Sequence, residues 1–160
     1  MIDAKELAAG FERNVQIIKT QCNGLTHEDS LRQAPFNINC LNWVVGHIAQ
    51  NRDTVLRLLG AEPALGEAGN RYRRESSPIA DESADVLPLD RLLASLELGQ
   101  ERISAALSNA IPDNLNRQVE FQGRQRSVGS WLFFLYFHDS YHTGQTDLLR
   151  QILGKNDKII

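Results

Sequence analysis

SVGSWLFFLYFHDSYHTGQTDLLRQILG, residues 127–154, is the stretch of the sequence that decides the fold. Apolar residues recur in it at spacings of three and four, which is typical of one buried face of a helix. These residues are Val128, Leu132, Leu135, Leu149 and Ile152. Ser127 is a suitable cap at the start and Gly154 a suitable stop at the end. We therefore predict one long helix over this stretch.

Three further stretches have the same helical spacing of apolar residues. We predict helices over residues 3–22, over residues 40–59 with Asn39 as the cap, and from residue 89 until Pro112. Residues 60–88 contain several prolines and glycines without a sustained period, which favours a long loop. The segment VEFQGRQRSV, with Gly123 at its centre, predicts a short hairpin or an extended connection.

Four helices of similar length predict an all-α fold, a four-helix bundle in a single domain over residues 1–160. Helices joined by short turns are antiparallel neighbours, whereas a loop as long as residues 60–88 can run the length of a helix. We therefore expect an up-down-down-up bundle with its crossover between the second and third helices. A simple up-down bundle with a loop excursion is the alternative.

The composition excludes several classes of protein. The 160 residues are 42% apolar and 23% charged with a formal net charge of -3, and no basic run suits a nucleic-acid backbone. No segment resembles a membrane helix or a secretory leader, so we expect a cytoplasmic protein without a membrane or nucleic-acid partner. Cys22 and Cys40 are expected to be buried thiols that act as small apolar side chains.

Polar side chains interrupt the apolar face of the last predicted helix. His138, His142 and Gln145 follow the helical spacing between Leu135 and Leu149. Burying a polar group without a partner costs about 1–3 kcal/mol, so something should satisfy these three. Histidines four residues apart have Cβ atoms roughly 5–6 Å apart on one helix face, which allows both to bind one ion.

The second predicted helix offers His47 as a third ligand, and we predict one divalent metal ion on His47, His138 and His142. The alternatives are a histidine pair on a solvated face and, for His47, a hydrogen-bonded core histidine. His27 lies among acidic residues and is expected to be exposed. Asp139 occupies the place of the glutamate in an HExxH zinc-protease motif, and the paired Glu-x-x-His motifs of di-iron bundles do not occur.

The segments NWVVGHIAQNRD and HDSYHTGQTDLLRQILG resemble the DinB-like (DinB/YfiT) superfamily in their G-H and H-x-x-x-H-x-G-Q motifs. The resemblance implies an up-down-down-up bundle whose metal is held by three histidines, here His47, His138 and His142. Relatives include enzymes that transfer a low-molecular-weight thiol, or use one in isomerisation. Many relatives are dimers, so a homodimer is consistent with the resemblance.

Three neutral imidazoles leave a bound ion its full charge, so a water in the open position would have its pKa lowered toward about 7. A thiol in that position would be held as the thiolate. The leading hypothesis is a metal-dependent thiol S-transferase with a low-molecular-weight thiol and a small electrophile as substrates. The alternatives are a hydrolase of small esters or amides and a non-catalytic, metal-stabilised interaction module. Zinc or nickel is the expected ion, and the ligand type also admits iron and manganese.

Supporting residues are predicted from their place beside the histidines. Gln145 and Asn51 lie one helical turn from a histidine and are expected to orient a ligand or meet the substrate. Four aromatic residues are expected either at a pocket mouth or in the core: Trp43, Trp131, Phe134 and Tyr141. Arg71, Arg73 and Arg74 belong to the long loop, where they either attract an acidic thiol or lie in solvent.

Overall fold

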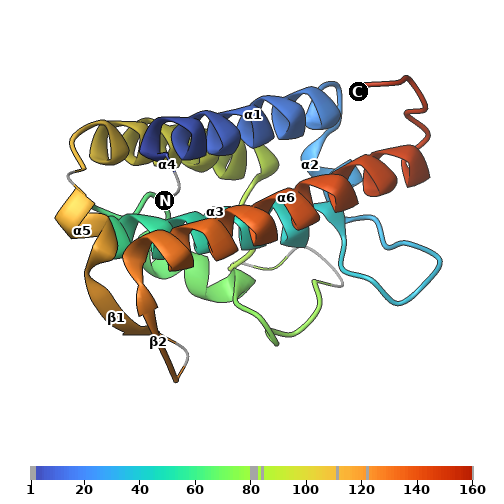
Figure 1. Ribbon diagram of the computed structural model, residues 1–160. Coiled ribbons are helices and arrows are strands. Elements are labelled where there is room, and N and C mark those ends of the chain that lie inside the picture. The colour runs from blue at the N-terminus through green and yellow to red at the C-terminus, as the bar shows by residue number, and fades with distance from the viewer. Residues whose placement is uncertain (1–2, 80–82, 84, 111, 122, 160) are drawn as a thin grey trace.

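Four long helices form the body of the molecule (Figure 1). The computed structural model describes residues 3–79, 83, 85–110, 112–121 and 123–159. The long helices are α1 (Ala4–Cys22), α3 (Leu41–Leu59), α4 (Leu89–Ser108) and α6 (Val128–Ile152). No helix in the described ranges has the length and apolar character that crossing a membrane requires.

Short elements join the long helices. They are α2 (His27–Leu31), the 3-10 helix η1 (Gly66–Tyr72), α5 (Pro112–Asn116), and the strands β1 (Gln118–Phe121) and β2 (Arg124–Ser127). The two strands form an antiparallel hairpin in which Phe121 pairs with Arg124. Gly123 has φ +70° at the turn, a conformation that glycine adopts readily. The hairpin predicted around Gly123 is confirmed.

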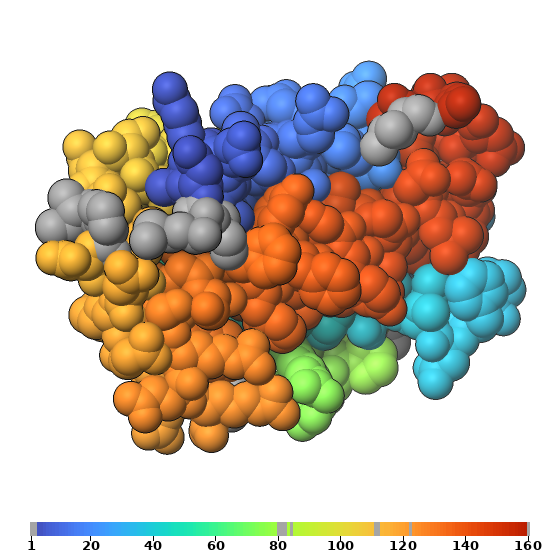
Figure 2. All heavy atoms as spheres, viewed as in Figure 1, coloured from blue at the N-terminus to red at the C-terminus, as the bar shows by residue number. Residues whose placement is uncertain are grey.

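The bundle is up-down-down-up. Helix α1 packs against α4 and α6, and α3 packs against the same two helices, so α1 and α3 lie across a diagonal. In Figure 1, α3 and α4 run in one direction while α1 and α6 run in the other. The parallel neighbours α3 and α4 are joined by residues 60–88, which confirms the predicted crossover. In Figure 2, α6 lies between α1 and the crossover and forms much of the visible face.

The helix ends show which capping predictions were right. The Ser127 hydroxyl accepts the Ser130 N–H at the start of α6, and Gly60 ends α3 in the left-handed region with φ 75°. The predicted cap Asn39 is wrong: Cys40 is the N-cap of α3 and makes no side-chain capping bond. The third helix ends at Ser108, earlier than predicted, and Pro112 opens the separate helix α5, because proline is tolerated in a first helical turn.

The crossover, predicted only as a long loop, is packed against the bundle and contains the 3-10 helix η1. Tyr72 at the end of η1 is fully buried. Its hydroxyl accepts the Leu87 N–H at 2.7 Å and donates to Asn42 Oδ1 at 3.2 Å. Ile79 is also buried. Sequence periodicity missed this packing because single anchors in irregular chain leave no period.

The apolar core is divided in two by a polar layer. One apolar cluster includes Leu41 and Leu96, and the other includes Leu56 and Ile103. Between them lie four buried polar residues, one from each long helix: Asn14, Arg52, Gln100 and Asp139. Because each of the four must meet its partners, the layer fixes how far each helix slides along the next. Cys22 and Cys40 are buried free thiols, as predicted.

Candidate metal centre

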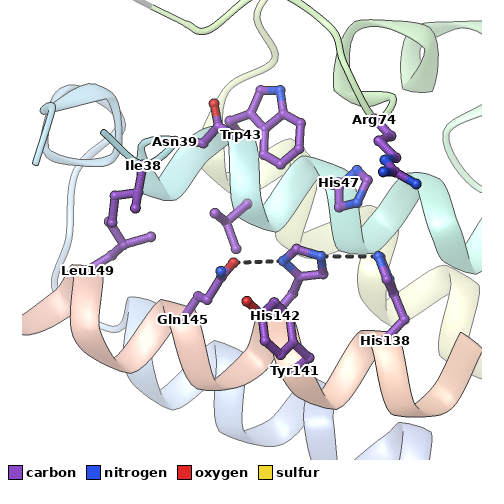
Figure 3. A pocket seen from close by; sticks show the side chains of 11 residues that line it. Ile38, Asn39, Trp43, His47, Arg74, His138, Tyr141, His142, Gln145 and Leu149 are labelled. Atoms are coloured by element: carbon purple, nitrogen blue, oxygen red, sulfur yellow. Dashed lines mark hydrogen bonds between the residues drawn. The ribbon is translucent and has the colours of Figure 1, made fainter. Parts of the chain in front are cut away.

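The three predicted histidines converge from two helices (Figure 3). His47 extends from α3, and His138 and His142 extend from α6. One ring nitrogen of each lies within 4.8 Å of those of the other two. The ring centroids of His138 and His142 are 4.4 Å apart, and the His47 centroid lies 4.8 Å from that of His142.

The crossover fixes the orientation of His47. The Nδ1–H of His47 donates to the Tyr72 carbonyl oxygen at 2.7 Å, which leaves Nε2 as the nitrogen that carries the lone pair. Trp43 stacks on the other side, with ring centroids 4.6 Å apart and planes 15° apart. Gly46 explains how Tyr72 comes so close, because a Cβ at residue 46 would lie 2.1 Å from the Tyr72 ring. The glycine of the G-H motif is therefore needed for the contact that orients the histidine after it.

The two histidines of α6 are oriented within their own helix. The Nδ1–H of His142 donates to Gln145 Oε1 at 2.7 Å, so its Nε2 also faces the cluster. That Nε2 lies 3.1 Å from Nε2 of His138. Nδ1 of His138 is buried and has no hydrogen-bond partner among the described residues. Gln145 thus contacts a histidine as expected, and within the described part of the chain the only hydrogen-bond contact of the His138 ring is with His142 Nε2.

Burial keeps the imidazoles neutral at pH 7. Desolvation lowers the pKa of His47 to about 4 and that of His138 to about 4. The pKa of His142 is also lowered by burial, against the opposing effect of its bond to Gln145. The positive charge of Arg74 contributes to the lowering at both His47 and His138. Neutral imidazoles with free lone pairs are the protonation state that metal binding needs.

The donor set fits a divalent metal ion. Tetrahedral nitrogen ligands at 2.0–2.1 Å from an ion lie roughly 3.3 Å apart, close to the 3.1 Å between the two Nε2 atoms of α6. Two of the three rings also have the Nδ1–H donated to an oxygen, the arrangement that commonly orients metal-bound histidines. Within the described residues, no fourth histidine, cysteine or carboxylate joins the cluster.

Two hollows meet at the histidines. The first has a volume of about 440 Å³ and largely apolar walls, which include Ile38, Trp43, Val44, Tyr141 and Leu149. The second has a volume of about 590 Å³ and is lined by polar and basic side chains together with the apolar Leu58, Phe121, Phe134 and Leu135. His47, His138 and Arg74 line both hollows. A reactant in either hollow would therefore reach the same histidine nitrogens.

The sequence model of the DinB superfamily matches residues 11–146 of the chain. The chain belongs to the DinB superfamily. The matched region begins within α1 and extends into α6, so it contains all three histidines of this DinB-superfamily protein. A search of curated protein sequences found no match.

The other predicted residues have diverse positions. Asn51 Nδ2 donates to the His47 carbonyl oxygen at 2.8 Å and lies 3.1 Å from His47 Nε2, so it contacts the nitrogen that faces the histidine cluster. Arg73 and Arg74 line the second hollow, whereas Arg71 forms an ion pair with Asp85. His27 is half-buried, not exposed as predicted, with its Nδ1 3.5 Å from Asn42 Nδ2.

The aromatic residues divide between the hollows and the core. Trp43 and Tyr141 line the first hollow and Phe134 lines the second, while Trp131 is buried beneath the hairpin residue Phe121. The residue that sequence reasoning missed is Tyr72, whose carbonyl oxygen orients His47. Gly46 was the available signal, because a glycine inside a long helix often marks a close approach by another segment.

Proposed function

We propose that this protein is a metal-dependent enzyme that transfers a low-molecular-weight thiol to a small electrophile, with zinc or nickel held by His47, His138 and His142. The observation that carries the proposal is the convergence of three neutral imidazoles, two of them oriented by Nδ1–H bonds, at the junction of two hollows. Three protein ligands are typical of catalytic zinc sites, because a structural site is usually closed by a fourth.

Different residues of the chain would have separate roles in such a reaction. A bound ion would supply Lewis acidity and acidify a thiol in its open position. Tyr72 and Gln145 hold His47 and His142 with their lone pairs toward the cluster. The apolar side chains of the first hollow would exclude water from the electrophile and hold it against the histidines. The sulfur forms a bond to the electrophilic carbon while that carbon loses its bond to a leaving group, or while an epoxide C–O bond or an alkene π bond breaks. In the substitution the electron pair departs with the leaving group and the thiol proton passes to solvent; in the additions the electron pair stays on the product and takes up a proton.

The two hollows favour group transfer over hydrolysis. Transfer needs two organic reactants beside one reactive centre, whereas hydrolysis needs one reactant and water. The apolar first hollow suits an electrophile, and the three arginines of the second hollow suit a charged thiol. A purely structural ion would not require open space on two sides of its ligands.

The first test is the metal content of the untagged protein after incubation with zinc and with nickel, measured by mass spectrometry. We expect about one equivalent in the natural protein and less than about a tenth in His142→Ala, since a three-ligand site loses most of its affinity with one ligand. His27→Ala is the matched control and should retain the metal. If the natural protein takes up neither metal, the proposal is wrong.

The second test is thiol transfer to 1-chloro-2,4-dinitrobenzene, an epoxide and an activated alkene, with several thiols. We expect metal-dependent product formation that is lost in His142→Ala and kept in His27→Ala. A loaded protein that hydrolyses small esters but transfers no thiol would instead support the hydrolase alternative. A loaded protein inactive in both assays would favour the interaction module.

A further inference from the structure

The second hollow concentrates positive charge beside the histidines. We call it the arginine hollow. Its lining residues are Arg57, Arg73, Arg74, Gln50, Asn51, Thr54, His47 and His138, with the apolar Leu58, Phe121, Phe134 and Leu135. No aspartate or glutamate belongs to its described lining. The whole chain has a formal net charge of -3, so this local excess of positive charge does not follow from the composition.

Two arginines of the hollow have guanidinium groups available for a ligand. Among the described residues, the side chains of Arg57 and Arg73 form no hydrogen bond or ion pair. Other arginines are used by the fold: Arg52 pairs with Asp139, and Arg150 pairs with Asp157. Arg74 has only a long contact of 3.7 Å with Glu75, and both side chains are exposed.

The α3 wall of the hollow supplies neutral hydrogen-bonding groups in a row. One face of α3 carries residues at spacings of three and four: the neutral His47, Gln50, Asn51 and Thr54, followed by the cationic Arg57. The opposite face of α3 is buried in the apolar core. Arg73 approaches the hollow from the crossover. Cations from two separate elements therefore face the same space.

We propose that the arginine hollow binds the carboxylate groups of the thiol cosubstrate, with Arg57 and Arg73 as the residues that pair with them. The assignment rests on the proposed thiol transfer. Guanidinium groups suit carboxylates because their N–H donors match the two oxygens. A thiol anchored by its carboxylates in this hollow would have its sulfur beside His47 and His138, which line the same space. The electrophile would then occupy the apolar hollow on the other side.

The test measures binding of S-methylglutathione to the zinc-loaded protein by isothermal titration calorimetry. This tripeptide keeps the carboxylates of glutathione, but its blocked sulfur cannot become a thiolate, so binding reports the carboxylate contacts. We expect Arg57→Gln combined with Arg73→Gln to weaken the affinity at least about tenfold, with a weaker salt dependence. The matched control combines Arg13→Gln with Arg91→Gln, two exposed positions on α1 and α4, and should change the affinity less than about twofold.

The diethyl ester of S-methylglutathione lacks the carboxylate charges, and we expect it to bind weakly and equally to all three proteins. The assignment is overturned if the natural protein does not bind S-methylglutathione, if the ester binds as tightly, or if both double variants bind like the natural protein. A lowered melting temperature with unchanged affinity would mean that Arg57 only stabilises the C-terminal end of α3.

Binding and transfer give separable results. Arginine-dependent binding without any thiol transfer would support the carboxylate site and contradict the proposed function. Thiol transfer that proceeds equally well with glutathione and with its diethyl ester would support the function and contradict the carboxylate site.

Discussion

Adjacent residues of α6 belong to two polar regions with opposite properties. Asp139 is buried in the polar layer, and its carboxylate accepts bonds from Arg52 Nε at 2.7 Å and from Asn14 Nδ2 at 2.7 Å. Arg52 in turn donates to Gln100 Oε1 and to the Phe11 carbonyl oxygen. His138 and His142 lie on either side of Asp139 along the helix. His138 lines both hollows, His142 lines the first, and their Nε2 atoms face each other at 3.1 Å.

This comparison distinguishes polar groups that stabilise the fold from polar groups that are placed to bind a ligand. Buried polar atoms in a folded core are nearly always paired, because an unpaired one lowers stability. The polar layer obeys this rule fully, with a partner for each charged group. The histidine cluster departs from it at His138 Nδ1, which has no partner among the described residues. In the same described ranges, its Nε2 atoms contact only one another and the Asn51 amide. Histidine nitrogens that converge from two helices at the junction of two hollows are the stronger indication of function.

The largest expected effect on stability comes from a substitution that disrupts the polar layer. Asp139→Ala leaves the Arg52 guanidinium buried without its counter-ion, so we expect the free energy of unfolding to fall by about 3–5 kcal/mol. Urea unfolding at pH 7 measures it. Asp147→Ala, on the same helix but outside the layer, is the control and should lower stability by less than about 1 kcal/mol.

His142→Ala tests whether the polar layer and the histidine cluster are independent. It should abolish metal binding while changing the stability of the metal-free protein by only about 1 kcal/mol. The folded fraction of Asp139→Ala should still bind about one metal ion. Loss of less than about 1 kcal/mol in Asp139→Ala would contradict the assignment of the layer to stability.

The next prediction concerns the contact between the crossover residue Tyr72 and the candidate metal centre. Gly46→Ala places a methyl group where the Tyr72 ring lies, and we expect it to destabilise the protein by about 1–3 kcal/mol through overpacking. Because Tyr72 also orients His47, metal affinity should fall as well. Gly144→Ala is the matched control, since nothing lies within 4 Å of its added Cβ. There we expect a gain of about 0.5–1 kcal/mol from helix propensity. Equal gains in both variants would show that Tyr72 moves aside without cost.

The helices and the three histidines were predictable because each is local or periodic. The spacing of four between His138 and His142 places them on one face of any helix, and the G-H motif marked His47. The polar layer was not predictable, since Asp139 finds Arg52 and Asn14 only after four distant helices pack together. The buried face of α6 accordingly passes through Asp139, Thr143 and Thr146, one position away from the predicted face through His138, His142 and Gln145.

A smaller effect tests the hydrogen bond that orients His142. Gln145→Leu removes the acceptor of its Nδ1–H while keeping a side chain of similar size, so the ring is no longer fixed with Nε2 toward the cluster. We expect zinc affinity to fall about 10- to 100-fold, with stoichiometry unchanged at saturating metal. Competition with a chromophoric chelator measures the change. Gln151→Leu, two turns further on, should have no effect; an unchanged affinity in Gln145→Leu would mean that packing alone orients His142.

The smallest expected effect is an increase in zinc affinity, whereas the preceding change lowers it. Asn51 Nδ2 lies 3.1 Å from His47 Nε2. A metal ion would need the lone pair of that nitrogen, so the amide would compete with the ion for it. Removing a typical hydrogen bond of about 0.5–1 kcal/mol in Asn51→Ala should therefore raise zinc affinity about two- to fivefold. Thr54→Ala, one turn along the same face, is the control and should leave the affinity unchanged. A lower affinity in Asn51→Ala would instead mean that the amide supports His47 through its 2.8 Å bond to the His47 carbonyl oxygen. The sign of this one change thus distinguishes a side chain that competes with the metal from one that helps to hold its ligand.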